Sequence, residues 1–213
     1  MSGNEKKFIT FLKFVFFTLK NKSPIVEIYL KGKKALDVGC GTGKLLKEDA
    51  KNFFGIDINE KVLKTAADRS LRVLKADGCI LPFKNEEFEA INCDNVIEHL
   101  LPEDAFKLLF EASRVLRRGG VLILRTQMAY REIWETFSHV RPYPPRAIEK
   151  LLHSELESYL NEREENFVRD LTIERIFYNG KYFKNSVLRN LSNTISFFTP
   201  LNRRGYIMIL RKG

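Results

Sequence analysis

The sequence predicts an α/β fold, a single domain (residues 1–213) built on a doubly wound, mostly parallel sheet of seven strands. Three observations support this class. Short apolar runs alternate with stretches of helical periodicity, which is typical of βαβ units and a parallel sheet. The first apolar run leads directly into a glycine-rich turn. The 213 residues are 44% hydrophobic and 30% charged, as expected for one globular domain rather than a disordered chain or a disulfide scaffold.

Seven apolar runs are the expected strands, and four stretches between them have helical spacing. The predicted strands are residues 35–38, 53–58, 72–76, 88–93, 121–125, 172–178 and 206–210. The predicted helices are residues 42–51, 60–68, 103–116 and 144–166. The third helix begins beside Pro102 and ends before Gly119 and Gly120, which are common boundary residues. The chain thus divides into an N-terminal helical extension (1–34), a core (35–126) and a region of late strands (127–213).

Residues 8–19 predict an amphipathic helix with a wide apolar face. Nine of these twelve residues are apolar, and Lys6, Thr10, Lys13 and Lys20 share one helical stripe. The stretch is shorter than the ~20 residues of a membrane-spanning helix. No small-residue cleavage site follows it, so it does not resemble a signal peptide. The helix either packs on the domain, covers its pocket, or lies in a lipid interface.

The positive net charge of +9 lies at the two ends of the chain. Residues 1–34 carry eight Lys and Arg against two acids, and residues 141–213 carry thirteen against eight. Residues 35–140 carry fifteen against seventeen. This asymmetry favours an anionic partner, either RNA, a membrane surface or an anionic substrate, although a merely basic surface gives the same counts.

The cysteine and histidine content bears on metal binding and on location. The chain has three cysteines, none of them in a CxxC pair, and three histidines. A structural zinc site is therefore unexpected, and we predict no metal. A reducing, cytoplasmic setting is expected, peripheral to the membrane if the N-terminal helix meets lipid.

The segment LDVGCGTG at residues 36–43 is the strongest chemical signal. Its glycines allow a tight turn and a close approach of ligand to backbone, beside the crevice at the carboxyl end of the first strand. A Walker P-loop needs Ser or Thr after Gly-Lys, where Leu45 stands. A dinucleotide fingerprint needs Gly or Ala where Lys44 stands. Both motifs are excluded, and the pattern D-x-G-x-G-x-G remains.

This pattern resembles motif I of the class I S-adenosylmethionine (SAM) dependent methyltransferases. Four further segments resemble the family in order and spacing: GIDIN at 55–59, ADG with LPF at 76–83, FEAINC with IEHL at 88–100, and EASRVLRRGG at 111–120. The third of them is similar to the small-molecule branch (methyltransferase type 11) that contains the ubiquinone and menaquinone biosynthesis enzymes. Glu89 and Arg118 depart from the Asp and Pro usual in the family.

The resemblance implies SAM as cofactor and S-adenosylhomocysteine as product, with a role for each motif. Residues 39–43 would hold the methionine part. Asp57 would bind the ribose, Ile58 would pack on the adenine, and Asp77 would accept from the adenine amino group. The backbone at 93–94 would border the methyl group. The predicted cofactor-binding residues are Asp37, Gly39, Cys40, Gly41, Gly43, Asp57, Ile58, Asp77, Gly78, Cys93 and Asp94.

The catalytic and substrate-binding candidates follow the fourth and fifth strands. His99 is the candidate general base, because its ordinary pKa is near ~6.5. In the alternative interpretation, His99 and Glu98 only shape the site. His139, Arg141 and Tyr143 either bind an anionic substrate or hold their loop against the sheet. Cys40 and Cys93 are expected to be small strand-end residues rather than nucleophiles.

We therefore expect a methyltransferase acting on a small or lipid-like acceptor, by O- or C-methylation. The basic ends keep an RNA or protein methyltransferase open, and a SAM-binding module without catalysis is a third class. No [DN]-P-P-[YFW] tetrad follows the fourth strand, which disfavours methylation of base amino groups in that style. Neither the acceptor nor an oligomeric state follows from the fold class.

Overall fold

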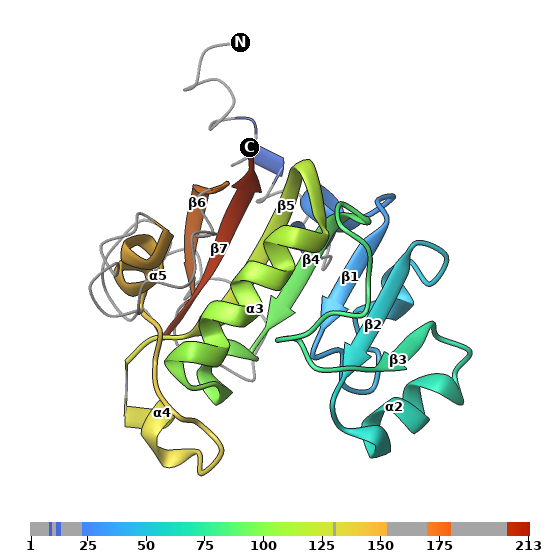
Figure 1. Ribbon diagram of the computed structural model, residues 1–213, viewed down its shortest axis with the longest axis horizontal. Coiled ribbons are helices and arrows are strands. Elements are labelled where there is room, and N and C mark those ends of the chain that lie inside the picture. The colour runs from blue at the N-terminus through green and yellow to red at the C-terminus, as the bar shows by residue number, and fades with distance from the viewer. Residues whose placement is uncertain (1–8, 10–11, 14–22, 130, 153–169, 180–203) are drawn as a thin grey trace.

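A seven-stranded sheet forms the centre of the computed structural model, which describes residues 9, 12–13, 23–129, 131–152, 170–179 and 204–213 (Figure 1). The strand order is β3-β2-β1-β4-β5-β7-β6. The strands are β1 (Ala35–Val38), β2 (Phe53–Asp57), β3 (Val73–Lys75), β4 (Phe88–Asp94), β5 (Leu116–Gln127), β6 (Leu171–Asn179) and β7 (Gly205–Lys212). Within this described part, β7 pairs antiparallel with both neighbours and the other pairs are parallel. The predicted fold class is confirmed.

Each face of the sheet has its own apolar core. On one face, α3 (Pro102–Val115) and α5 (Pro145–Leu152) bury Leu108, Leu109 and Ile148 against the sheet. Figure 1 shows α3 lying across the front of β4 and β5. On the other face, a π-helical turn, Val26–Leu30, and α2 (Glu60–Ala67) pack on the remaining side chains of the strands. Strand β1 is buried along its whole length, as its apolar run predicts.

The predicted helix over residues 42–51 is wrong. Between β1 and β2 the chain forms turns and one 3₁₀ turn, Leu46–Glu48. Gly41 and Gly43 have positive φ angles of 53° and 75°, which a right-handed helix cannot contain. Asp49 then ends the segment, because its carboxylate accepts hydrogen bonds from the Asn52 side chain and from the Gly32 backbone N–H. These local bonds compete with helical ones.

The other predicted helices agree with the structure where it describes them. Helix α2 matches 60–68, α3 matches 103–116, and α5 covers the first part of 144–166. The rest of that stretch and most of the predicted N-terminal helix over 8–19 lie outside the described residues. No described helix combines the length and the apolar character needed to cross a membrane.

Candidate active site

A cavity of about 280 Å³ opens at the carboxyl ends of the parallel strands, where doubly wound sheets bind ligands. Six of the predicted site residues line it: Gly39, Asp57, Ile58, Asp77, Gly78 and His99. The other lining residues are Val38, Ile56, Ala76, Cys79, Asn95, Val96, Leu100 and Leu108. Four separate motifs of the sequence therefore meet at one cavity, and its walls are mostly apolar.

The glycine-rich turn needs glycine for steric reasons. Gly39 has a φ angle of 74°, and a Cβ placed there would lie 2.4 Å from Cγ2 of Val96. The backbone N–H groups of Gly39 and Cys40 both donate to the carbonyl oxygen of Ile56, at 2.9 Å each. These bonds join the turn to the end of β2. Among the described residues, no atom beyond its chain neighbours lies within 4 Å of the position that a Cβ on Gly41 would take, so this side of Gly41 is open.

Asp57 is held at the end of β2 by two backbone groups. Its Oδ2 accepts from the Gly41 N–H at 2.9 Å, and its Oδ1 accepts from the Asn59 N–H at 2.8 Å. Asn59 in turn caps α2 by accepting from the N–H of Lys61. A carboxylate has about four acceptor positions, so two remain for a ligand in the cavity. Ile58 follows with an exposed apolar side chain.

Asp77 lines the same cavity, directly after Ala76, whose N–H donates to the Asp57 carbonyl oxygen at 3.2 Å. The Oδ1 atom of Asp77 accepts from the backbone N–H of Cys79 at 2.8 Å, and Asp77 pairs with Ile80 in a short antiparallel bridge. A Cβ on Gly78 would lie 2.9 Å from side chains of both Val38 and Leu108, so this close packing requires glycine. The turn is therefore compact, and the second oxygen of Asp77 stays available to a ligand.

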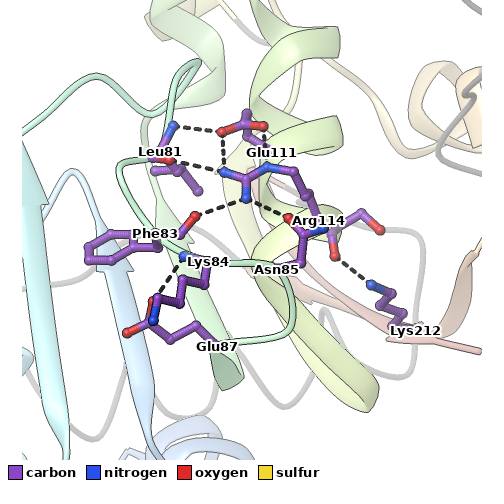
Figure 2. Close-up of polar contacts among 9 residues, drawn as sticks. Leu81, Phe83, Lys84, Asn85, Glu87, Glu111, Arg114 and Lys212 are labelled. Carbon is purple, nitrogen blue, oxygen red and sulfur yellow. Dashed lines mark hydrogen bonds and ion pairs between the residues drawn. The ribbon is translucent and has the colours of Figure 1, made fainter.

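The segment after this turn is tied to α3 by Arg114 and Glu111 (Figure 2). The Arg114 guanidinium donates to the carbonyl oxygens of Leu81 and Phe83, at 2.9 and 2.8 Å, and to the side chain of Asn85. Glu111 pairs with Arg114 and also accepts from the Leu81 N–H at 2.7 Å. The E-x-x-R pattern on α3 thus anchors the segment at 81–85, which follows the cavity wall formed by residues 76–79.

Several predicted cofactor residues are absent from the cavity lining. Asp37 is buried and accepts from the Asn92 side chain at 2.7 Å, and burial raises the pKa of Asp37 to about 7. Burial also raises the pKa of the Cys40 thiol to about 12 and that of Cys93 well above its ordinary value. Both thiols therefore stay protonated, which makes them poor nucleophiles.

Asp94, Gly41 and Gly43 also lie outside the lining of the cavity. Asp94 ends β4 and forms an ion pair of 2.8 Å with Arg125 on β5. The next residue, Asn95, lines the cavity with a φ angle of 55° and was not predicted. The sequence could have indicated Asn95, because this residue directly follows the fourth strand and ligands bind at the ends of such strands.

We call the side of the cavity that is lined by His99 and Leu100 the acceptor side. Two of the predicted histidines lie together there. The rings of His99 and His139 lie 4.8 Å apart between centroids, in an edge-to-face arrangement. The loop that carries His139 is bound to the end of β4, because the Val140 N–H donates to the Glu98 carbonyl at 2.8 Å. Glu98 itself is fully buried and accepts from the Thr126 hydroxyl at 2.9 Å. Burial raises the pKa of Glu98.

Tyr143 and Arg141 have different surroundings. Tyr143 is buried, its hydroxyl donates to the Leu100 carbonyl at 2.9 Å, and its own carbonyl accepts from Tyr206 on β7. These contacts hold the loop against the sheet, the second of the two roles considered from the sequence. Arg141 is exposed, and its guanidinium lies 5.2 Å from the centre of the Tyr143 ring.

Comparisons with known proteins agree with this geometry. Residues 36–124 match the methyltransferase domain family. A tRNA (carboxymethyluridine(34)-5-O)-methyltransferase of Arabidopsis thaliana is 31% identical over 61% of this chain and 33% of its own length. A demethylmenaquinone methyltransferase of Staphylococcus aureus is 32% identical over 44% of this chain and 42% of its own. A crystal structure of a SAM-dependent methyltransferase from Archaeoglobus fulgidus, 21% identical, covers 93% of this chain and 99% of its own with a TM-score of 0.62.

Residues 36–124 are a class I SAM-dependent methyltransferase domain. The predicted family and cofactor are thereby confirmed. The chain spans at most about half the length of the first curated relatives it matches. The cavity fits the nucleoside part of SAM in its chemistry, because Asp57 and Asp77 each keep acceptor positions for hydroxyl or amino donors between apolar walls.

Proposed function

We propose that this methyltransferase acts on a small, apolar or lipid-like acceptor. The observation that carries the proposal is a group of large apolar side chains that face solvent beside the two histidines. These are Leu101, Trp134, Phe137 and Val140, which are between 41% and 106% exposed. They belong to two segments that contact each other through the Val140–Glu98 and Tyr143–Leu100 hydrogen bonds. None of the four lines the described cavity, but they lie beside His99, which does, and a group of exposed apolar side chains beside a pocket is a common mark of an apolar ligand.

In the proposed reaction, SAM supplies a methyl group that is already activated on a sulfonium. The protein mainly positions the acceptor against this methyl group and shields both from water. Asp57 and Asp77 would hold the ribose and adenine, and the turn at 39–43 would hold the methionine part. The apolar side chains at 101 and 134–140 would place the acceptor and exclude water. Orientation of this kind can lower a barrier by up to about 7–11 kcal/mol.

His99 is the proposed proton acceptor for a hydroxyl or an acidic carbon of the acceptor. Its Nδ1 lies 2.9 Å from the carbonyl oxygen of Ser138, which can only accept, so Nδ1 carries the proton. The lone pair is therefore on Nε2. Because His99 lines the cavity, its position supports the role of this nitrogen as the base.

A nucleic-acid acceptor is the second candidate, and the relatives favour it. Besides the plant enzyme, proteins named as probable tRNA methyltransferases in mouse, cattle and human are 33–34% identical to this chain over 51% of its length. The charge of +9 suits a polyanion. Trp134 and Phe137 would then stack on bases instead of contacting a lipid chain.

One assay separates the two candidates. We would measure S-adenosylhomocysteine release with prenylated phenolic acceptors and with unmodified tRNA. We expect turnover with the apolar acceptors, and we expect W134A and F137A to raise their KM roughly tenfold without changing SAM affinity. L74A, which removes an exposed apolar residue on β3, is the matched control and should change neither. Turnover with tRNA alone would overturn the first candidate and support the second.

A further inference from the structure

Three metal-ligating side chains converge at the acceptor side of the cavity. The ligand atoms of Glu98, His99 and His139 all lie within 4.8 Å of one another. Two of these residues are adjacent after β4, whereas His139 arrives on a loop forty residues later. The backbone bond from Val140 N–H to the Glu98 carbonyl, 2.8 Å long, holds that loop in place. The cluster is therefore a product of tertiary structure.

In each of the two imidazole rings, Nε2 is the nitrogen atom that is left to bind a metal ion. The Nδ1 atoms of His99 and His139 each lie 2.9 Å from a backbone carbonyl oxygen, those of Ser138 and Ile133. Since a carbonyl only accepts, each Nδ1 carries its proton and each Nε2 has the lone pair. In the part of the chain that the structure describes, neither Nε2 has a hydrogen-bond partner. A backbone acceptor on the far nitrogen is the usual arrangement behind a metal-bound histidine.

Glu98 supplies an unpartnered oxygen at the same place. Its side chain is fully buried, and one carboxylate oxygen accepts from the Thr126 hydroxyl at 2.9 Å. Its other oxygen, Oε1, is buried without a donor among the described residues. A buried carboxylate oxygen without a donor has lost its hydration with nothing in return, which destabilises the fold. A cation at the cluster would remove that cost.

We propose that Glu98, His99 and His139 bind a divalent transition-metal ion, with Zn²⁺ as the best fit. Two neutral imidazoles and one carboxylate are ligands that suit Zn²⁺ rather than Mg²⁺, which prefers oxygen. Donors around a tetrahedral Zn²⁺ are roughly 3.3 Å apart, so ligand atoms that lie within 4.8 Å of one another need to close by up to about 1.5 Å. His99 is exposed and lines the cavity, so a fourth position would be open to solvent or to an acceptor oxygen.

This site does not depend on which acceptor the enzyme uses. It does compete with the proposed base, because the lone pair on His99 Nε2 takes either a proton or a metal ion. His99 would therefore act as the base in the metal-free protein, whereas with Zn²⁺ bound the open fourth position would take the acceptor oxygen. Metal binding is measured directly and without acceptor, so a failure of this proposal is distinguishable from a failure of the proposed function.

The test is a calorimetric titration of Zn²⁺ into the full chain, prepared without a histidine tag and freed of metal by chelation. We expect one equivalent to bind, and we expect Mg²⁺ not to bind at the same concentrations. H139A and H99A should each weaken Zn²⁺ binding by more than roughly tenfold. SAM affinity of H139A should stay unchanged, which shows that the variant is folded.

The third histidine of the chain provides the matched control. His153 lies outside the described residues, and H153A should bind Zn²⁺ as the wild type does. The proposal is overturned if no Zn²⁺ binds, or if H139A binds as tightly as the wild type. It is also overturned if H153A loses the metal. Titration of Co²⁺ followed by visible absorption gives a second readout, because the band intensity reports a low-coordinate site with nitrogen ligands.

Discussion

The cofactor side and the acceptor side of the cavity are built in different ways. On the cofactor side, each key carboxylate binds a backbone group two residues away, as in Asp57 with Asn59 and Asp77 with Cys79, and Asp57 also binds Gly41, sixteen residues away. On the acceptor side, the partners are far apart in sequence: Thr126 and Glu98 are 28 residues apart, His99 and Ser138 are 39, and Tyr143 and Leu100 are 43. Local turns fix the carboxylates that face the cavity on the cofactor side, whereas the contacts of the acceptor side named here are all long-range.

The difference explains which half is recognisable as a motif. Local turns need particular residues at particular spacings, such as glycine at positive φ or a carboxylate two residues before an N–H, so they leave a pattern in the sequence. Long-range contacts leave no such pattern, because they need only that two segments meet in the folded chain. This comparison implies that SAM binding and stability depend strongly on the local geometry of the cofactor side.

The largest expected effect is that of G41A. Gly41 and Gly32 both have positive φ angles, 53° and 76°, and both have open space where a Cβ would point. The backbone strain of the two alanine variants should therefore be similar, about 1–2 kcal/mol. Gly41 donates its N–H to Asp57, which lines the cavity, whereas Gly32 donates to Asp49, which does not, so G41A should weaken SAM binding by more than roughly 100-fold and G32A should not. Calorimetry with SAM on G41A and G32A checks this, and equal affinities would contradict it.

R114A should destabilise the fold by about 2–3 kcal/mol, because the carbonyls of Leu81 and Phe83 lose their donor. Urea unfolding measures the change. K107A, which removes an exposed ion pair with Asp104 from the same helix, serves as the control and should leave the midpoint where it is. If R114A unfolds at the wild-type midpoint, the anchor shown in Figure 2 does not hold the segment at 81–85.

Asp37 makes stability depend on pH. Its folded pKa of about 7 lies above the ordinary 3.8, so the folded state keeps a proton that the unfolded state has lost. Stability from this group is therefore lost as pH rises from about 4 through 7. Relative to the wild type, D37N should gain about 2 kcal/mol more at pH 8 than at pH 5, measured by urea unfolding at both. D49N, whose carboxyl has a lowered pKa from its Asn52 and Gly32 hydrogen bonds, should show no such gain.

The smallest expected effect is that of D57N on SAM affinity. An asparagine keeps one oxygen acceptor but loses the charge and the second oxygen, so we expect a loss of roughly tenfold, about 1.4 kcal/mol. Asp49 accepts from Gly32 much as Asp57 accepts from Gly41, at 3.0 and 2.9 Å. D49N is therefore a matched control for the loss of a carboxylate that supports a glycine turn. An equal loss of SAM affinity in D49N would show an indirect effect of stability.

The sequence alone determined the strand positions, the sheet class and the cofactor motifs, because burial periodicity and turn chemistry are local properties. It predicted a helix over 42–51 from composition, whereas glycines at positive φ and the Asp49 turn prevent that helix. Only the tertiary structure decided which motif residues line the cavity and which, like Asp37, lie buried behind it. It also placed His139 against His99 and Glu98. No spacing rule predicts that cluster, because it depends on where a loop between β5 and β6 packs on the end of β4.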